Sequence, residues 1–212
     1  MRIMSSLAVA ALAACASACV ELTSPTPLFP TADRALPAPI EEGAWVAIDE
    51  DCPREALQTQ PLPKGCQPFE LHQGADGVWV AHGLERGQNG QESEREMRFV
   101  IAPATENVPP NTYAPLYVAE HQNDASPPAW SYVVIAPIGT LPAHEVFVLG
   151  TISCDAALRD GPINGVRSRH DAHGALTACT ASKPSAVREA ARRAMIQALP
   201  TIDETRLVHL EH

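Results

Sequence analysis

Short apolar runs alternate with turn-forming residues through the middle of the chain. Seven such runs are rich in β-branched or aromatic residues and are bounded by Gly, Pro or Asn, as is typical of strands. No helical pattern separates them, so we expect an antiparallel meander that forms a curved sheet or a small barrel. The segment 87–96 has the composition of an exposed hairpin loop with its turn at Asn89-Gly90. The predicted strands span residues 44–48, 69–71, 78–82, 97–102, 116–120, 130–136 and 145–152.

One convincing helical pattern occurs, over residues 183–199. Ser182 is suited to cap its start, Pro184 suits its first turn and Pro200 ends it. An Ala-rich apolar stripe at helical spacing predicts that this helix covers the sheet closely. A last strand is predicted at 205–210. The fold class is therefore α+β and mainly β, with one C-terminal helix on the sheet. The stripe consists of Val187, Ala190, Ala191, Ala194, Met195 and Ala198.

Proline interrupts any periodicity between Val20 and Glu42, where five prolines occur within 15 residues. Together with the residues just before it, this composition predicts a tether over 15–42 that precedes a single domain over 43–212. The Leu28-Phe29 pair is the exception, since apolar residues in a linker often dock onto the domain that follows.

The N-terminus has the pattern of an export signal. Met1-Arg2 precedes a largely apolar run that is too short to span a bilayer, and small residues follow it. The ending Leu12-Ala13-Ala14-Cys15 resembles the lipobox of bacterial lipoproteins. The resemblance implies a signal peptide over 1–14 and a mature chain that begins with a lipidated Cys15. Three alternatives stay open: cleavage before Cys19, after Ala16-Ser17-Ala18; an ordinary secretory signal without lipid; and an uncleaved anchor.

In that family the cysteine carries a diacylglycerol and usually an acyl chain on its amine, and two or more chains anchor stably. Ala16, where an Asp would retain the protein at the inner membrane, favours the outer membrane. The mature chain also resembles small, uncharacterised lipoproteins of the Gram-negative envelope, which carry no activity over to it. That second resemblance rests on the order of Leu28-Phe29, Ala32-Asp33, Gly43-Ala44-Trp45, Cys52, Cys66, Cys154, Cys179 and the helix from Ala186.

Charge argues against nucleic acid as a partner. The formal net charge of the 212 residues is -10, and no basic patch could compete for phosphates. An acidic surface is also not attracted to anionic headgroups, so contact with the membrane would depend on the lipid.

Four cysteines remain after Cys15 and Cys19, an even number in an oxidising compartment, so disulfides are expected. Four cysteines allow three pairings; the local ones are Cys52 with Cys66 and Cys154 with Cys179. A zinc site built from the four thiolates is the competing hypothesis, but the C-x2-C knuckles of such sites are missing.

No motif of a common enzyme class occurs: there is no G-x-S-x-G, P-loop, H-E-x-x-H or dinucleotide fingerprint. We expect no cofactor, and enzymatic activity stays open, with binding favoured. The candidate metal ligands are His170, Asp171 and His173, whose donor types suit zinc or copper. The simpler interpretation of that segment is a solvated loop held by a Cys154 to Cys179 bridge.

Weaker candidates are two neighbouring His–Glu pairs and three tryptophans. Adjacent residues of a strand point to opposite faces, which weakens each pair as an acid/base couple. The tryptophans have aliphatic neighbours, which favours core packing over a ligand platform. These residues are Glu120-His121, His144-Glu145, Trp45, Trp79 and Trp130.

The leading hypothesis is a lipid-anchored cell-envelope protein that binds or scaffolds, with the membrane as partner through its anchor and an envelope protein as a candidate partner. The alternatives are a periplasmic enzyme or enzyme inhibitor, and a metal-binding lipoprotein.

Overall fold

The computed structural model describes residues 20–30, 39–49, 51–59, 61–86, 92–104, 116–137, 143–198 and 206–210. Its strands are β1 (Leu22–Ser24), β2 (Gly43–Ile48), β3 (Phe69–Gln73), β4 (Trp79–Arg86), β5 (Glu92–Pro103), β6 (Tyr117–Gln122), β7 (Trp130–Pro137), β8 (Glu145–Thr151), β9 (Val166–His170), β10 (Leu176–Ala181) and β11 (Arg206–His209). The helices are the 3-10 helix η3 (Arg54–Gln58), α1 (Cys154–Leu158) and α2 (Pro184–Ala198).

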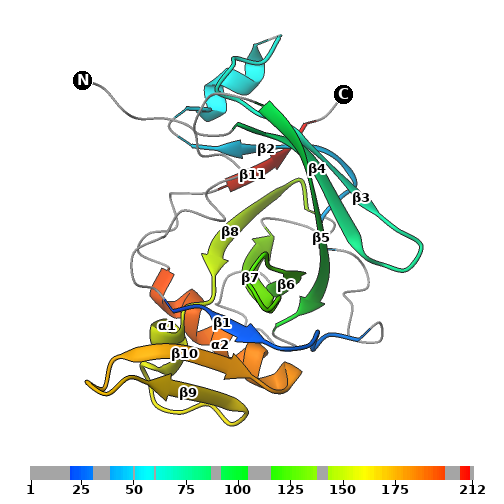
Figure 1. Cartoon of the computed structure of the whole chain (residues 1–212). Coiled ribbons are helices and arrows are strands. Elements are labelled where there is room, and N and C mark those ends of the chain that lie inside the picture. The colour runs from blue at the N-terminus through cyan, green and yellow to red at the C-terminus, as the bar shows by residue number, and fades with distance from the viewer. Residues whose placement is uncertain are drawn as a thin grey trace, which may run out of the picture.

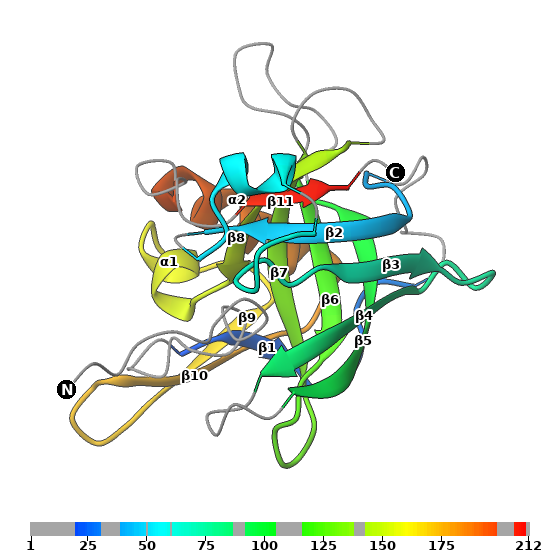
Figure 2. The same ribbon diagram turned by 90° about the horizontal axis from the view of Figure 1, so that it is seen from above.

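Eight strands close into an antiparallel barrel (Figure 1). Their order is β6-β5-β4-β3-β2-β11-β8-β7, and pairing of β6 with β7 joins the two ends. The mainly β fold and the barrel-like sheet are therefore confirmed, although the sheet is not a simple meander. β11 comes from the C-terminus and inserts between β2 and β8. In Figure 2, β2 and β11 run side by side across the barrel. Closure leaves these eight strands without a free edge.

The interior of the barrel is filled by alternate side chains of its strands. In β7, Val133 and Ile135 belong to this interior core, whereas Tyr132 and Val134 belong to a second core on the outer face. Because both faces of β7 are covered, its apolar run is continuous. Seven of the eight barrel strands contribute buried residues to the interior core, and Leu207 of β11 packs against it. Its buried members are Ile40, Trp45, Leu71, Trp79, Phe99, Ile101, Tyr117, Ala119, Val133, Ile135, Ala143 and Val146.

The tryptophans serve this packing. Trp45 and Trp79 are buried in the interior core, which agrees with the expectation that they pack rather than present a ligand face. Trp130 is half-buried at the start of β7.

The outer core lies between the β5–β7 wall and a second layer that contains both α-helices. Small residues of α2, among them Ala186, Ala190 and Ala191, are fully buried and bring the helix backbone close to the sheet. β1, β10 and β9 extend the sheet from the start of β7: β1 pairs antiparallel with β7 and parallel with β10. In Figure 1 these strands and both α-helices lie at the lower end of the molecule.

Residues 20–30, here called the N-terminal strap, correct the predicted tether. Leu22 pairs with Cys179 in the sheet, and Leu22 and Phe29 are buried in the outer core. Ile40 is buried in the interior core. The prolines permit this because the strand ends at Ser24, before Pro25, so no ladder hydrogen bond is lost. The tether prediction is therefore wrong for 20–30 and for 39–42; residues 1–19 and 31–38, which include the predicted signal peptide, lie outside the described residues.

The segment from Cys154 to Cys179, predicted as a solvated loop, instead contains α1 and the β9–β10 hairpin. Ser153 caps α1 by accepting a hydrogen bond from the Ala156 N–H at 3.1 Å. β9 is exposed along four of its five residues, so it lacks the apolar alternation that marks a strand in a sequence. The structure contains both local disulfides, Cys154–Cys179 and Cys52–Cys66. The second packs with Val46 on the outer side of β2.

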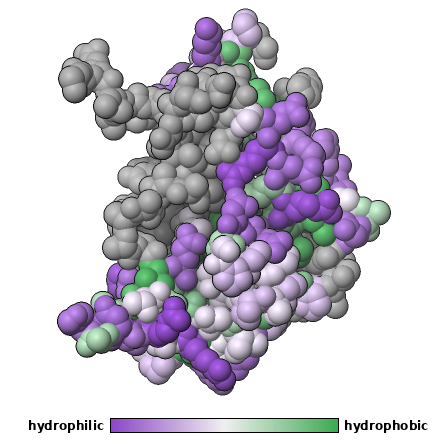
Figure 3. All heavy atoms as spheres, in the orientation of Figure 1, coloured by the Kyte–Doolittle hydropathy of each residue, from purple (hydrophilic) through white to green (hydrophobic). Residues whose placement is uncertain are grey.

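Hydrophilic residues predominate over β3, β4 and β5 on the face shown in Figure 3, and apolar residues there are scattered. Leu84, at 46% exposure, is the single large apolar side chain that the described part of the chain leaves exposed.

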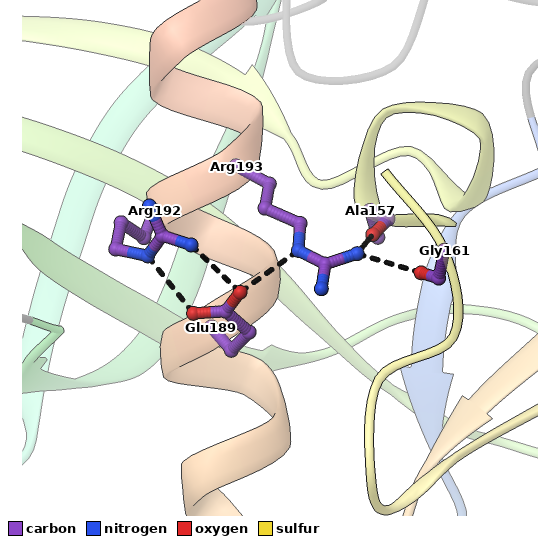
Figure 4. Close-up of polar contacts among 5 residues, drawn as sticks. All are labelled: Ala157, Gly161, Glu189, Arg192 and Arg193. Carbon is purple, nitrogen blue, oxygen red and sulfur yellow. Dashed lines mark hydrogen bonds and ion pairs between the residues drawn. The ribbon is translucent and has the colours of Figure 1, made fainter. Parts of the chain in front are cut away.

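Glu189, Arg192 and Arg193 of α2 form a polar cluster that links this helix to α1 (Figure 4). Glu189 accepts hydrogen bonds from Arg192 Nε and Nη2 and from Arg193 Nε, at 2.8 to 2.9 Å. Arg193 Nη1 in turn donates to the carbonyls of Ala157 and Gly161 at the end of α1. The hydrogen bonds from Arg192, and more weakly the one from Arg193, lower the pKa of the Glu189 carboxyl to about 2. The ionised carboxylate thus orients the side chain that ties α1 to α2.

We expect Glu189→Gln to lower the free energy of unfolding at pH 7 by about 1 kcal/mol, a value that allows for solvent screening. The folded-state pKa lies below the unfolded value, so this stabilisation is present at neutral pH and fades as pH falls from about 5 towards 2. Urea unfolding at pH 7 and pH 3 measures it, with Glu70→Gln on the exposed side of β3 as control. An equal loss at both pH values would contradict the ionic role.

Candidate functional site

Glu41, His144 and His209 meet at one end of the barrel and are here called the Glu41 cluster. Glu41 precedes β2, His144 precedes β8 and His209 is the last residue of β11. They converge because β11 pairs with both β2 and β8, and because Ile40 bridges to Ala143. Among the described residues this is the one group of three His, Cys, Asp or Glu whose ligand atoms all lie within 4.8 Å of one another.

The carboxylate of Glu41 lies between the two imidazoles. Its Oε2 is 3.4 Å from His144 Nδ1 and 3.9 Å from His209 Nδ1. The rings of His144 and His209 lie 5.6 Å apart. Side-chain exposure falls from 55% for His144 through 31% for Glu41 to 14% for His209, so the cluster is open to solvent on the His144 side.

His209 is held firmly in place. Its Nε2 lies 3.0 Å from the Glu42 carbonyl, and its ring packs edge-on against Trp45 at 5.3 Å between centroids. Trp45 Nε1 donates to the Glu41 carbonyl at 3.1 Å, which fixes the backbone beside the ring. Gly43 makes room for the imidazole, because a Cβ there would lie 2.6 Å from His209 Nε2, and its φ of +126° favours glycine.

The contacts of His209 define its tautomer. A carbonyl oxygen only accepts, so Nε2 carries the proton that it donates to Glu42, and neutral His209 has its lone pair on Nδ1. This Nδ1 atom is buried and has no hydrogen-bond partner. It faces the Glu41 carboxylate, which is also an acceptor. His209 Nδ1 and the Glu41 carboxylate therefore present converging lone pairs, an arrangement suited to a cation.

Of the predicted metal ligands, His170 is the last residue of β9, and Asp171 and His173 lie in the turn that follows it. Asp171 Oδ1 accepts hydrogen bonds from the N–H groups of His173 and Ala175, at 2.8 and 2.9 Å. The ring nitrogens of His170 contact the Gly174 carbonyl and the Ser168 hydroxyl. These polar atoms serve the turn and do not form a three-ligand group of the kind found at Glu41.

Glu120 and His121 point to opposite faces of β6 and form no acid/base pair. Glu120 is fully buried beneath the strap, where it accepts hydrogen bonds from the N–H groups of Leu28, at 2.6 Å, and Phe29, at 3.3 Å. Burial raises the pKa of the Glu120 carboxyl, although these bonds and one from Tyr132 oppose the shift. Burial lowers the pKa of the His121 imidazole. Glu120 thus anchors the strap.

His144 and Glu145 also face different partners. His144 contacts Glu41, whereas Glu145 forms ion pairs with Arg54 and Arg206. The neighbouring pair is therefore split between the Glu41 cluster and a separate ionic contact.

Sequence reasoning singled out His144 but missed Glu41 and His209. Each is an isolated polar residue beside an apolar run, and no spacing relates the three, which are separated by 103 and 65 positions. The three residues become neighbours because β11 inserts between β2 and β8. This insertion is a property of the assembled sheet and has no local sequence pattern.

The lipidation candidates Cys15 and Cys19 lie outside the described residues. Within the described part of the chain, no helix has the length and apolar character that a membrane crossing requires.

No protein-family model, curated protein sequence or solved structure matches this chain. Function is therefore inferred from the chain's own residues.

We expect Glu120→Ala to release the strap. The partly buried Leu28 N–H and the buried Phe29 N–H would lose their acceptor, which lowers the free energy of unfolding by about 2 to 4 kcal/mol. Amide hydrogen exchange should show protection falling at Leu28 and Phe29 before it falls in β6. Glu70→Ala, an exposed glutamate on β3, is the control. Unchanged protection at both amides would show that Glu120 does not hold the strap.

Proposed function

We propose that this chain is a lipid-anchored protein of the bacterial cell envelope whose barrel domain acts by binding and is held close to the membrane. One observation supports the closeness of the domain to the membrane. β1 begins at Leu22, seven residues after Cys15, and is built into the sheet between β7 and β10. Seven residues span at most about 25 Å, so lipid on Cys15 would keep the domain against the membrane surface.

Several features support the anchor. Residues 12–15 resemble a lipobox, and the two disulfides suit an oxidising compartment outside the cytoplasm. The net charge of -10 gives the protein little attraction to anionic headgroups, so stable membrane contact needs the lipid.

The strap is suited to transmit the anchor to the fold. Beyond the three residues of β1, Glu120 binds the backbone at Leu28 and Phe29. The Phe29 ring lies edge-on to Tyr132 and under the guanidinium of Arg188 on α2. The strap therefore contacts both the barrel wall and the second layer.

The anchor also defines an orientation. In Figure 1, β1 lies at the lower end of the molecule, whereas β2 and β11, which carry or flank Glu41 and His209, lie at the upper end. An anchor that leads into β1 places the Glu41 cluster on the side facing away from the membrane, where partners and small ligands reach it freely.

Intact mass of the membrane fraction, after expression in a Gram-negative host, tests the anchor. The wild type and Cys19→Ser should each carry a diacylglyceryl mass on a chain that begins at Cys15. Cys15→Ser should lose this mass and leave the membrane fraction. An unmodified wild-type chain in the periplasmic extract would contradict the proposal, and a lipid that follows Cys19 instead would move the attachment site.

A further inference from the structure

We propose that Glu41, His144 and His209 form a binding site for a divalent transition-metal ion, and that zinc is the ion that fits best. This site gives the barrel a ligand of its own, and it does not depend on the lipid anchor, because the three residues lie in the folded domain.

The donor set is the first argument. Two imidazole nitrogens and one carboxylate oxygen are ligands that zinc accepts in proteins, and three protein ligands leave a fourth position for water or another ligand. The half-exposed His144 gives solvent access to that position. A site of this kind binds an ion that can still coordinate a further molecule.

The spacing of the donors is the second argument. Ligands at about 2.0 to 2.1 Å from a tetrahedral zinc ion lie about 3.3 Å from one another. Glu41 Oε2 and His144 Nδ1 already lie 3.4 Å apart, and His209 Nδ1 is 3.9 Å from the same oxygen. All three ligand atoms lie within 4.8 Å of one another, so small side-chain rotations of the partly exposed Glu41 and the exposed His144 bring them to coordination distance, while His209 stays fixed.

The state of His209 is the third and independent argument. Metal-bound histidines usually donate their other ring N–H to a carbonyl or carboxylate, which fixes the tautomer. His209 Nε2 makes this contact with the Glu42 carbonyl, and Nδ1 is left buried without a partner and directed at Glu41. A proton on Nδ1 would not form a hydrogen bond over 3.9 Å. A metal ion between the two atoms satisfies both.

Zinc titration of the full chain, stripped with a chelator beforehand, tests the site. Competition with a chromophoric chelator should give one zinc ion per chain. His144→Ala and Glu41→Gln should each weaken the affinity more than about tenfold, since even the loss of a residue that only supports a ligand costs 10- to 100-fold. Zinc should raise the Tm of the wild type but not of these variants. Cobalt in place of zinc should give the intense visible absorption of four-coordinate geometry.

The matched control is His173→Ala, which removes another exposed histidine near a carboxylate and should leave zinc affinity unchanged. Circular dichroism in chelator checks that each variant is folded; His209→Ala is avoided because the ring also packs on Trp45. Zinc binding that survives both His144→Ala and Glu41→Gln, or that is lost in His173→Ala, overturns the proposal. Intact mass reports lipid on Cys15 separately, so failure of this site and failure of the anchor are distinguishable.

Discussion

The two layers of this protein depend on strand β7. It closes the barrel by pairing with β6, continues the barrel wall by pairing with β8, and starts the extension of the sheet by pairing with β1. Both faces of the strand are also covered, since Val133 belongs to the interior core and Tyr132 to the outer core. Apolar burial on both faces is the main stabilising term for such a strand, since seven of its eight residues are buried. The strap, the helices and the interior tryptophans all pack against structure that β7 joins.

Whether the sequence pattern reveals a strand depends on whether the strand has a buried face. β7 and β2 are apolar and β-branched, and residues 130–136 and 44–48 mark them closely. β5 begins at Glu92, five residues before its predicted start, because its first half is charged and pairs with β4 outside the buried part of the wall. β9 is missed for the same reason, since an exposed edge strand has no alternation to detect. Local pattern therefore reveals strands with a buried face and misses those stabilised by pairing alone.

In the strap, the sequence pattern predicts a linker where the structure has a packed segment. Five prolines between residues 25 and 39 indicate an extended linker, yet extended backbone is also what a strand and a docked segment require. What distinguishes them is a buried acceptor for the free N–H groups, and Glu120, 92 positions after Leu28, supplies it. The Glu41 cluster has the same origin: its three members become neighbours only once β11 has inserted between β2 and β8. Composition carries no information on contacts between residues that are this far apart in the sequence.

The arrangement of the two proposed sites follows from the course of the chain. A lipid on Cys15 would lie within seven residues of β1, at one end of the molecule, while the strands that position Glu41 and His209 lie at the other. The barrel between them is closed and filled with side chains, so it holds the two sites apart. An ion at the Glu41 cluster would thus be presented at the end of the barrel away from β1. Its fourth coordination position would open on the His144 side, the most exposed part of the cluster. Binding a partner through such a position requires only that the partner supply one further donor atom.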